Sequence, residues 1–527
     1  MRDFDWSLPY ASRRSPVLAR NVVAASQPLA AQAGLSLIAR GGSAADAAIG
    51  AAIALTVVEP TNNGVGSDAF ALVWDEDRIA GLNASGRSPA AWAAEKFAGE
   101  TAMPATGWGS VTVPGAVSGW VELWRRFGRL PFAKLFEPAI AYARDGFPVS
   151  PIVARHWALQ GPLLAGNSAF AATFLPNGRT PVTGETFRSE ELARTLEEIA
   201  TTEGESFYRG ELARRIAATA RAEGGALSAG DLADHRADWV EPLQVEFHGA
   251  RLHELPPNTQ GLAALIALGI LARLPLAEHD VDSVDAVHLE IEAMKLALGD
   301  VRRHVGDPAA MTVEPASLLE ASHLDRRAAL VDSHRARPLE AAGTAAGDTV
   351  YLATADATGQ MVSYIQSNYF GFGSGVVVPG TAISMQNRGS GFSLEPGHPN
   401  IVRPRKRPFH TLIPGFATIG GQGCMSFGVM GGPMQAQGHV QMMVRIALHG
   451  QNPQAAADAP RWQVLGGVEV GVEPGFDAAA IEALRERGHS ISVLDPTWFG
   501  GAQIICKGAD GWVAASDPRK DGQAAGF

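Results

Sequence analysis

The stretch Ala341–Gln366, AAGTAAGDTVYLATADATGQMVSYIQ, changes character at Thr349. Before that residue it holds Ala, Gly and Thr with little to pack, whereas TVYLATA alternates β-branched and aromatic residues as a strand does. The turn-like DATG and the second apolar run QMVSYIQ complete the pattern of a β-hairpin. The sequence therefore predicts an exposed, flexible linker, about residues 333–348, that ends where a threonine opens a strand.

A threonine at such a junction can serve as a nucleophile. Its hydroxyl needs a base within hydrogen-bond reach. Cleavage of the Asp348–Thr349 bond would free an α-amine about 3 Å from the Thr349 hydroxyl, and an unperturbed α-amine has a pKa of about 7.7–8.0, suited to general-base work at neutral pH. From the pattern alone, an ordinary loop-to-strand junction that happens to carry threonine is the alternative.

A second feature is CMSFGVMGGPMQAQGHV, which predicts a strand, a turn at Gly431 and Gly432, and a helix with Pro433 at its first position. Backbone amides near a helix N-terminus can stabilise a developing oxyanion, and residues without side chains let a substrate carbonyl approach them. A plain strand-to-helix turn is the alternative. His439, on the predicted helix, is interpreted as a packing or capping residue.

Composition limits the class of protein. The chain has 527 residues, of which 46% are hydrophobic and 18% charged, as in soluble globular proteins. Its formal net charge of -11 argues against nucleic acid or an anionic membrane as partner. Cys424 and Cys506 cannot form a disulfide framework or a four-cysteine zinc site, which leaves one bridge or two reduced thiols.

Targeting and membrane signals are weak. The N-terminal MRDFDWSLPYASRRSP lacks the apolar region of a secretory signal. The longest apolar run, after Asp46, has about a dozen residues, short of the ~20 that a membrane helix needs. No G-x-S-x-G, H-E-x-x-H or G-x-x-x-x-G-K-[ST] motif occurs. We therefore expect a cytoplasmic protein that lacks these serine-nucleophile, zinc-protease and phosphate-loop motifs.

The arrangement of patterns along the chain predicts an α/β fold. GGSAADAAIGAAIALTVVEP predicts a helix that Ser43 caps with help from Asp46 and that ends before Pro60. GVGSD, residues 64–68, is interpreted as a tight turn before a hairpin. Helical patterns dominate from about Val113 to Ala233, a strand signal returns around Val245, and two more helical patterns follow. Beyond Thr349 the chain is rich in strand patterns. Strands flanked by helices on both sides of Thr349 suggest a layered sandwich whose two parts share one core.

Ordered blocks across nearly the whole chain resemble one known family. These blocks are RGGSAADAAIGAAIALTVVEPTNNGVGSDAF, VPGAVSGW, PAIAYARDGF, DLADHRADWVEP, EAMKLALGDVRRHVGDP, TVYLATADATG, PGHPN, KRPFHTLIPG and GVMGGP. They resemble the γ-glutamyltransferase family of N-terminal nucleophile hydrolases. The resemblance implies a precursor that cleaves itself between Asp348 and Thr349, into a large subunit (1–348) and a small subunit (349–527) folded together as a four-layer αββα sandwich. It implies no metal or organic cofactor, and a homodimer of processed heterodimers is a further expectation.

The same resemblance assigns roles to single residues. It makes Thr349 the nucleophile, Gly431 and Gly432 the oxyanion donors, and Ser367 the hydrogen-bond partner of the nucleophile. Arg87, in SGRSPA, matches the family arginine that binds the substrate's α-carboxylate.

Departures from the family pattern concern the substrate. In MQNRGSGFS, Gly391 stands where the family has the Asp that holds the α-ammonium of a glutamyl group. His410 and Thr411 replace a serine pair, and Tyr369 replaces an asparagine. A buried ammonium without a carboxylate partner is costly. The residues predicted to bind substrate are Arg87, Tyr369, Asn387, Arg388, His410 and Thr411.

These observations predict a self-cleaving N-terminal-threonine amidohydrolase. Its substrate would be an amide of a small carboxylate-bearing molecule, of the oxamate or dicarboxylic-monoamide type, cleaved through an acyl-enzyme. The first alternative is a genuine γ-glutamyltransferase or glutathione hydrolase. The second is a non-catalytic binding protein that keeps the sandwich and never matures.

Overall fold

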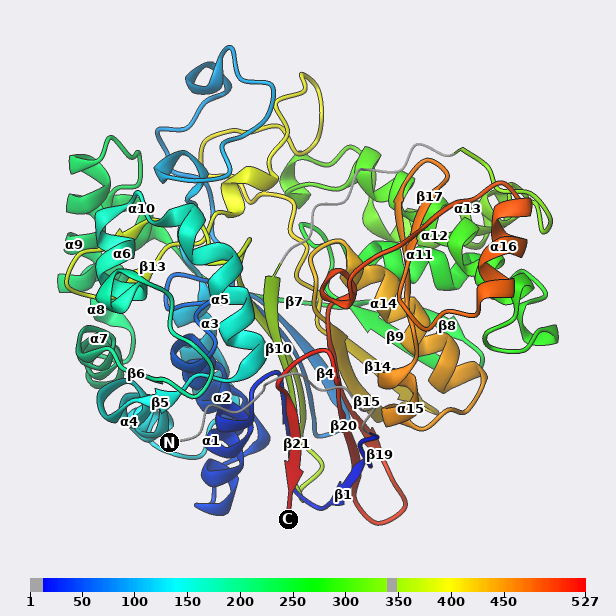
Figure 1. Ribbon diagram of the computed structural model, residues 1–527. Helices are drawn as coiled ribbons and strands as arrows, with labels where there is room; N and C mark the ends of the chain where they lie inside the picture. Colours follow the sequence, from blue (N-terminus) through cyan, green and yellow to red (C-terminus); the bar gives the residue numbers. More distant parts are fainter. Residues whose placement is uncertain (1–12, 339–347) are drawn as a thin grey trace.

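The computed structural model describes residues 13–338 and 348–527, and two seven-stranded antiparallel sheets form its centre (Figure 1). The first sheet has the order β1-β20-β19-β15-β14-β9-β8 and the second the order β21-β2-β10-β11-β3-β4-β7. The strands of the first sheet are β1 (Val17–Ala19), β8 (Leu243–Phe247), β9 (Ala250–Glu254), β14 (Gly415–Ile419), β15 (Gln422–Val429), β19 (Ala502–Lys507) and β20 (Trp512–Ser516). Those of the second are β2 (Val22–Ala25), β3 (Asp68–Asp75), β4 (Arg78–Asn83), β7 (Asp238–Val240), β10 (Asp348–Ala355), β11 (Met361–Tyr369) and β21 (Gln523–Gly526).

Helices cover the outer face of each sheet (Figure 1). On the second sheet lie α1 (Pro28–Ala39), α2 (Ala44–Val58) and α3 (Ala116–Phe127), with α4 (Glu137–Asp145), α5 (Pro151–Leu164), α6 (Ser168–Phe174), α7 (Glu190–Thr201), α8 (Glu205–Arg209), α9 (Glu211–Ala222) and α10 (Ala229–Asp234) on the same side of the molecule. On the first sheet lie α11 (Gly261–Leu271), α14 (Met434–Met443) and α15 (Pro453–Asp458), with α12 (Val284–His304), α13 (Ala321–Ala328) and α16 (Ala478–Glu486) on that side.

Smaller sheets complete the secondary structure. A three-stranded sheet beside α12 and α16 contains β16 (Trp462–Gly466), β17 (Glu469–Val472) and β18 (Ser490–Val493). Two short pairs are β5 (Phe147–Pro148) with β6 (Thr186–Phe187), and β12 (Val377–Val378) with β13 (Ile383–Ser384).

Three apolar cores separate the four layers. Tyr351, Ile365 and Phe416 belong to the core between the two sheets, and each sheet packs its other face against its own helices. This is the predicted αββα sandwich. Residues before and after Thr349 both contribute strands to each large sheet, so the two parts of the chain form one sandwich together, as predicted.

The locally encoded elements agree with their patterns. Helix α2 begins after Ser43, whose side chain accepts from the Asp46 amide while the Asp46 carboxylate accepts from the Ser43 amide. The hairpin of β10 and β11 pairs Val350 with Gln366 and Ala355 with Met361. Cys424 and Cys506 are free, half-buried thiols.

The segment before Thr349 is described only in part. Residues 333–338 have no helix or strand, and residues 339–347 of the predicted linker lie outside the described residues. Asp348 already belongs to β10. In the described ranges, no helix combines the length and apolar character required to cross a bilayer.

Candidate active site

Thr349 is the second residue of β10, at the end of the strand where its pairing with β11 begins. The register shifts between Asp348 and Val350, and such a bulge re-aims the side chain that it contains. The Thr349 side chain is almost fully buried, at 1% exposure. Its Oγ1 donates to Oγ of Ser367 over 3.3 Å and accepts from Nε2 of Gln435 over 3.5 Å. The predicted nucleophile therefore contacts the predicted Ser367 and one residue that was not predicted.

Ser367 connects the nucleophile to the end of β11. Its Oγ accepts from the Tyr369 amide over 2.7 Å. Tyr369 has a φ of +87°, which is strained for a residue with a side chain and is common at functional sites. The strained backbone turns the Tyr369 ring toward the guanidinium of Arg388, whose Cζ lies 4.2 Å from the ring centroid.

Gly431 and Gly432 connect β15 to α14, as predicted, although the helix begins at Met434 and Pro433 occupies its N-cap. Their φ values are +114° and +59°, a region that glycine adopts readily. No protein acceptor for either amide occurs among the described residues. Two consecutive unpaired donors before a helix are suited to an oxyanion.

Gln260 and Gln435 hold this turn in place. Nε2 of Gln260 donates to the carbonyls of Gly432, over 2.9 Å, and Thr411, over 2.7 Å. Gln435 donates its amide to the Gly432 carbonyl and its side chain to Thr349. Thr411 accepts from Nη1 of Arg388 over 2.9 Å. A closed ring of contacts thus runs through Thr349, Ser367, Tyr369, Arg388, Thr411, Gln260, Gly432 and Gln435.

Arg388 is the cation of this ring. It is 1% exposed, and burial lowers its pKa from the ordinary 12.5 to about 10. Apart from Thr411 and the Tyr369 ring, the Arg388 guanidinium has no partner in the described chain, and its Nε and Nη2 are buried without a hydrogen bond. Burial of a charged guanidinium with unpaired N–H donors costs folding free energy unless an anion binds it.

His410 and Asp68 lie next to Arg388 and are fully buried. Nδ1 of His410 accepts from the Leu412 amide, so Nε2 carries the proton and donates to Oδ2 of Asp68 over 3.2 Å. Desolvation lowers the His410 pKa well below its usual value and raises the Asp68 pKa to about 7, against the opposing attraction of Arg388. A neutral His410 is therefore a support for Asp68.

Besides its bond with His410, Asp68 holds the loops that contain Gly86 and Gly115. Its Oδ1 accepts from the amides of Gly86, over 3.2 Å, and Gly115, over 3.0 Å. Asp68 also pairs with Ser367 across β3 and β11. From sequence, GVGSD is a stretch that could border the pocket, with a tight turn preferred, and Asp68 itself is assigned no role. The only signal was an acid at the start of an otherwise apolar strand.

Asn387 positions the loop that carries Arg388. Its Oδ1 accepts from the Phe370 amide over 3.2 Å, and its Nδ2 donates to the Ala105 carbonyl over 2.7 Å. Gly391, further along the loop, lies against Phe409, because a Cβ added to Gly391 would be 2.9 Å from the Phe409 carbonyl oxygen. The loop therefore has no space for a side chain at position 391 unless its neighbour moves.

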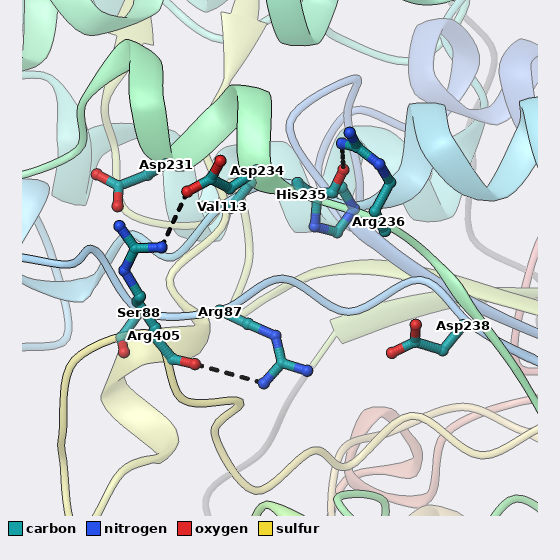
Figure 2. Close-up of a pocket in the computed structure, with 9 residues that line it drawn as sticks. All are labelled: Arg87, Ser88, Val113, Asp231, Asp234, His235, Arg236, Asp238 and Arg405. Atoms are coloured by element: carbon teal, nitrogen blue, oxygen red, sulfur yellow. Dashed lines mark hydrogen bonds and ion pairs between the residues drawn. The ribbon is translucent and has the colours of Figure 1, made fainter.

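Arg87 lies in a different cavity, of about 310 Å³ (Figure 2). Its Nη1 contacts Oδ2 of Asp307 over 3.1 Å and the Arg405 carbonyl over 3.4 Å. The cavity is lined by Arg87, Ser88, Val113, Asp231, Asp234, His235, Arg236, Asp238 and Arg405, and not by Thr349 or Gly431. Of the residues predicted from sequence, the structure joins Thr349, Ser367, Tyr369, Arg388, Thr411 and Gly432 in one ring and leaves Arg87 outside it.

A buried cluster away from this site contains residue types that commonly bind metal ions. His288, Glu292 and His489 converge, but Nζ of Lys295 donates to Glu292 over 2.7 Å and lies 3.4 Å from Nδ1 of His489. His288 bonds His489 over 2.8 Å and the Asp332 carbonyl over 2.8 Å. Each imidazole nitrogen thus has a protein partner, and the ammonium of Lys295 occupies the position of a cation.

Comparison with known proteins identifies the family of the chain. Residues 30–527 match the family model described as Gamma-glutamyltranspeptidase. The oxamate amidohydrolase proenzyme of Klebsiella pneumoniae is 39% identical over 97% of this chain and 99% of its own length. The glutathione hydrolase-like YwrD proenzyme of Bacillus subtilis is 35% identical over 98% of this chain and 100% of its own. A crystal structure of cephalosporin acylase from Bacillus halodurans superposes with a TM-score of 0.96 at 48% identity, covering 100% of this chain and 99% of that one.

The match extends over both parts of the chain and both large sheets, so fold and family are established together. The relatives are named hydrolases, acylases and amidohydrolases, and the chain is an enzyme of this amidohydrolase type. It belongs to the gamma-glutamyltranspeptidase family of N-terminal nucleophile hydrolases.

Proposed function

We propose that the chain cleaves itself before Thr349 and then hydrolyses an amide of a small, carboxylate-bearing substrate. The observation that carries the proposal is the ring of contacts that holds the Thr349 hydroxyl beside Ser367 and Gln435. Gln435, in the first turn of α14, also donates its amide to the Gly432 carbonyl, and the Gly431 and Gly432 amides have no acceptor among the described residues. The proenzyme names of the relatives support a precursor that matures by cleavage.

Maturation would begin with attack of Oγ1 of Thr349 on the Asp348 carbonyl. The peptide nitrogen leaves as the α-amine of Thr349, and Asp348 is held as an ester on Oγ1. Water then hydrolyses the ester, which frees the Asp348 carboxyl group and the hydroxyl. Ser367, at 3.3 Å from Oγ1, is placed to assist the proton transfers.

Catalysis would use the same oxygen with the new amine as base. The α-amine accepts the hydroxyl proton, Oγ1 attacks the amide carbon, and the negative charge falls on the former carbonyl oxygen. The Gly431 and Gly432 amides would donate to that oxygen. Collapse expels the amine with the transferred proton and leaves an acyl-threonine, which water attacks to release the acid. No step uses a metal or an organic cofactor.

The proposed substrate class rests on the charge of the ring that contains Thr349. Arg388 is a buried cation, and the position of the family's ammonium-binding Asp is Gly391. An oxamate or a dicarboxylic monoamide supplies a carboxylate and an amide without an ammonium group. The names of the Klebsiella and Bacillus halodurans relatives, an oxamate amidohydrolase and a cephalosporin acylase, are consistent with this class.

Intact-mass analysis of wild type and Thr349→Ala tests the maturation step. The wild type should give two chains that begin at residues 1 and 349, and Thr349→Ala should stay full-length and inactive. Thr358→Ala, which changes an exposed threonine in the β10–β11 turn, is the matched control and should mature normally. Cleavage of Thr349→Ala at the wild-type rate, or full activity from uncleaved wild type, would contradict the proposal.

Initial rates separate the alternatives. Oxamate, glutaric acid monoamide and glutathione are compared at equal concentrations with processed enzyme. We expect one of the first two to be preferred. Preference for glutathione would instead indicate the γ-glutamyltransferase alternative, and absence of both cleavage and turnover would indicate the non-catalytic binding protein.

A further inference from the structure

The guanidinium of Arg388 has hydrogen-bond donors that the described residues leave unused. Nη1 donates to Thr411, and the other two nitrogens, Nε and Nη2, are buried and have no hydrogen-bond partner within residues 13–338 and 348–527. These two nitrogens lie on one edge of the planar guanidinium and direct parallel N–H bonds, which match the two oxygens of one carboxylate. The open donors are therefore the pair that bidentate binding requires.

The guanidinium is also held in one orientation. Its Cζ lies 4.2 Å from the centroid of the Tyr369 ring, and Thr411 fixes its opposite edge. A buried arginine that is already ordered loses little side-chain entropy when an anion binds. Asp68 does not fill the open edge, because its oxygens accept from His410, Gly86 and Gly115.

Arg87, the arginine at the family's carboxylate-binding position, is engaged elsewhere. Its side chain is 45% exposed and pairs with Asp307. Asp307 in turn accepts from the Arg407 amide over 2.8 Å and the Ala309 amide over 3.1 Å. Figure 2 shows Arg87 beside Arg405 in a cavity that Thr349 does not line. These contacts suit a residue that fastens the loop around Arg405 and Arg407.

We infer that Arg388, and not Arg87, binds the carboxylate of the substrate through Nε and Nη2. This inference rests on the proposed function and defines its substrate class more narrowly. The substrate is an amide whose acyl group ends in a carboxylate and carries no ammonium beside it. An ammonium group next to this carboxylate would be repelled by the Arg388 guanidinium, and Gly391 offers no carboxylate to balance its charge. The site thereby selects ω-amidated acids over γ-glutamyl compounds.

The test compares Arg388→Gln with Arg87→Gln on two substrates. Glutaric acid monoamide carries the carboxylate, and butyramide is a neutral counterpart that lacks it. Arg388→Gln should lower kcat/KM for the acid about 100-fold more than it lowers kcat/KM for butyramide, because two charge-assisted hydrogen bonds to the carboxylate are lost. Arg87→Gln should leave the ratio of the two substrates unchanged. A selective loss of kcat/KM for the acid in Arg87→Gln but not in Arg388→Gln would overturn the inference.

Binding measurements keep the test independent of catalysis. Glutarate and oxalate are titrated calorimetrically into wild type, Arg388→Lys and Arg388→Gln, after intact mass has established that each is processed. Wild type should bind at least one of the two anions, Arg388→Lys more weakly because a single ammonium lacks the paired donors, and Arg388→Gln not measurably. Equal binding by all three proteins would refute the role of Arg388. If wild type binds the anion but hydrolyses neither amide, the proposed function fails and the anion site stands.

Discussion

Oε1 of Glu254 lies 2.6 Å from Nδ1 of His439, and both side chains are fully buried. Nε2 of His439 accepts from the amide of Val429, the last residue of β15, over 3.3 Å. The pair therefore joins β9, α14 and the strand that leads into Gly431. It supports the turn whose amides are proposed to bind the oxyanion.

Removal of one member of this pair should be more damaging than removal of both. His439→Leu leaves Glu254 buried without a partner, which should cost about 3–5 kcal/mol of unfolding free energy in urea titrations. The double variant Glu254→Leu/His439→Leu should recover part of that loss because no charge is left uncompensated. His248→Asn, at an exposed histidine, is the control. A double variant less stable than His439→Leu would contradict this account.

Gly431→Ala should impair catalysis through the position of the turn. A Cβ at Gly431 would lie 3.1 Å from Cα of Gly500, and the φ of +114° disfavours a side chain. Displacement of one oxyanion donor typically costs about 10²–10³ in kcat. Gly467→Ala carries a positive φ of +54° in open space and controls for backbone strain alone. Steady-state kinetics should show the loss in kcat only for Gly431→Ala.

Replacement of Gly391 by Asp should not create a glutathione hydrolase. A Cβ there would be 2.9 Å from the Phe409 carbonyl oxygen, so the loop must shift before a carboxylate can reach the pocket. We expect destabilisation of about 1–3 kcal/mol and no gain in glutathione turnover. Gly391→Ala separates the steric effect from the charge and should be destabilised to a similar extent. A glutathione rate that rises in Gly391→Asp but not in Gly391→Ala would show that the loop adapts.

The parts of the fold that could be predicted were those that neighbouring residues encode. The α2 cap at Ser43 and Asp46 and the β10–β11 hairpin depend on contacts a few residues apart, and both agree with the structure. The strand order could not be predicted, because β10 lies between β2 and β11 and the two parts of the chain interleave.

In the candidate site, too, residues with a local sequence pattern could be predicted and residues that depend on distant contacts could not. Thr349, Gly431 and Gly432 stand out because their turn and strand patterns are local. Asp68, Gln260 and Gln435 were missed because their roles depend on contacts between distant segments, such as Gln260 with Gly432 and Asp68 with His410. The position of Arg87 depends equally on Asp307, which no local pattern connects with it.

The pH dependence of substrate affinity should report on Asp68. Burial raises its folded-state pKa from 3.8 to about 7, so the carboxyl is neutral below that pH and ionised above it. The ionised form attracts Arg388 and repels a substrate carboxylate at the open edge of the guanidinium. KM for glutaric acid monoamide should therefore rise about 3- to 10-fold as the pH rises from about 6 to 8.

The control separates this titration from that of the catalytic amine. The α-amine of Thr349 would affect both substrates alike, whereas the charge of Asp68 acts only on the acid, so the ratio of KM for glutaric acid monoamide to KM for butyramide should rise over the same range. In Asp68→Asn the KM for the acid should lose its dependence on pH, since Asn keeps an oxygen for the Gly86 and Gly115 amides but cannot ionise. If Asp68→Asn is too unstable to assay, glutarate affinity of the wild type, measured calorimetrically, should weaken across the same pH range. A glutarate affinity that is constant or increases with pH would remove Asp68 from the charge balance of the site.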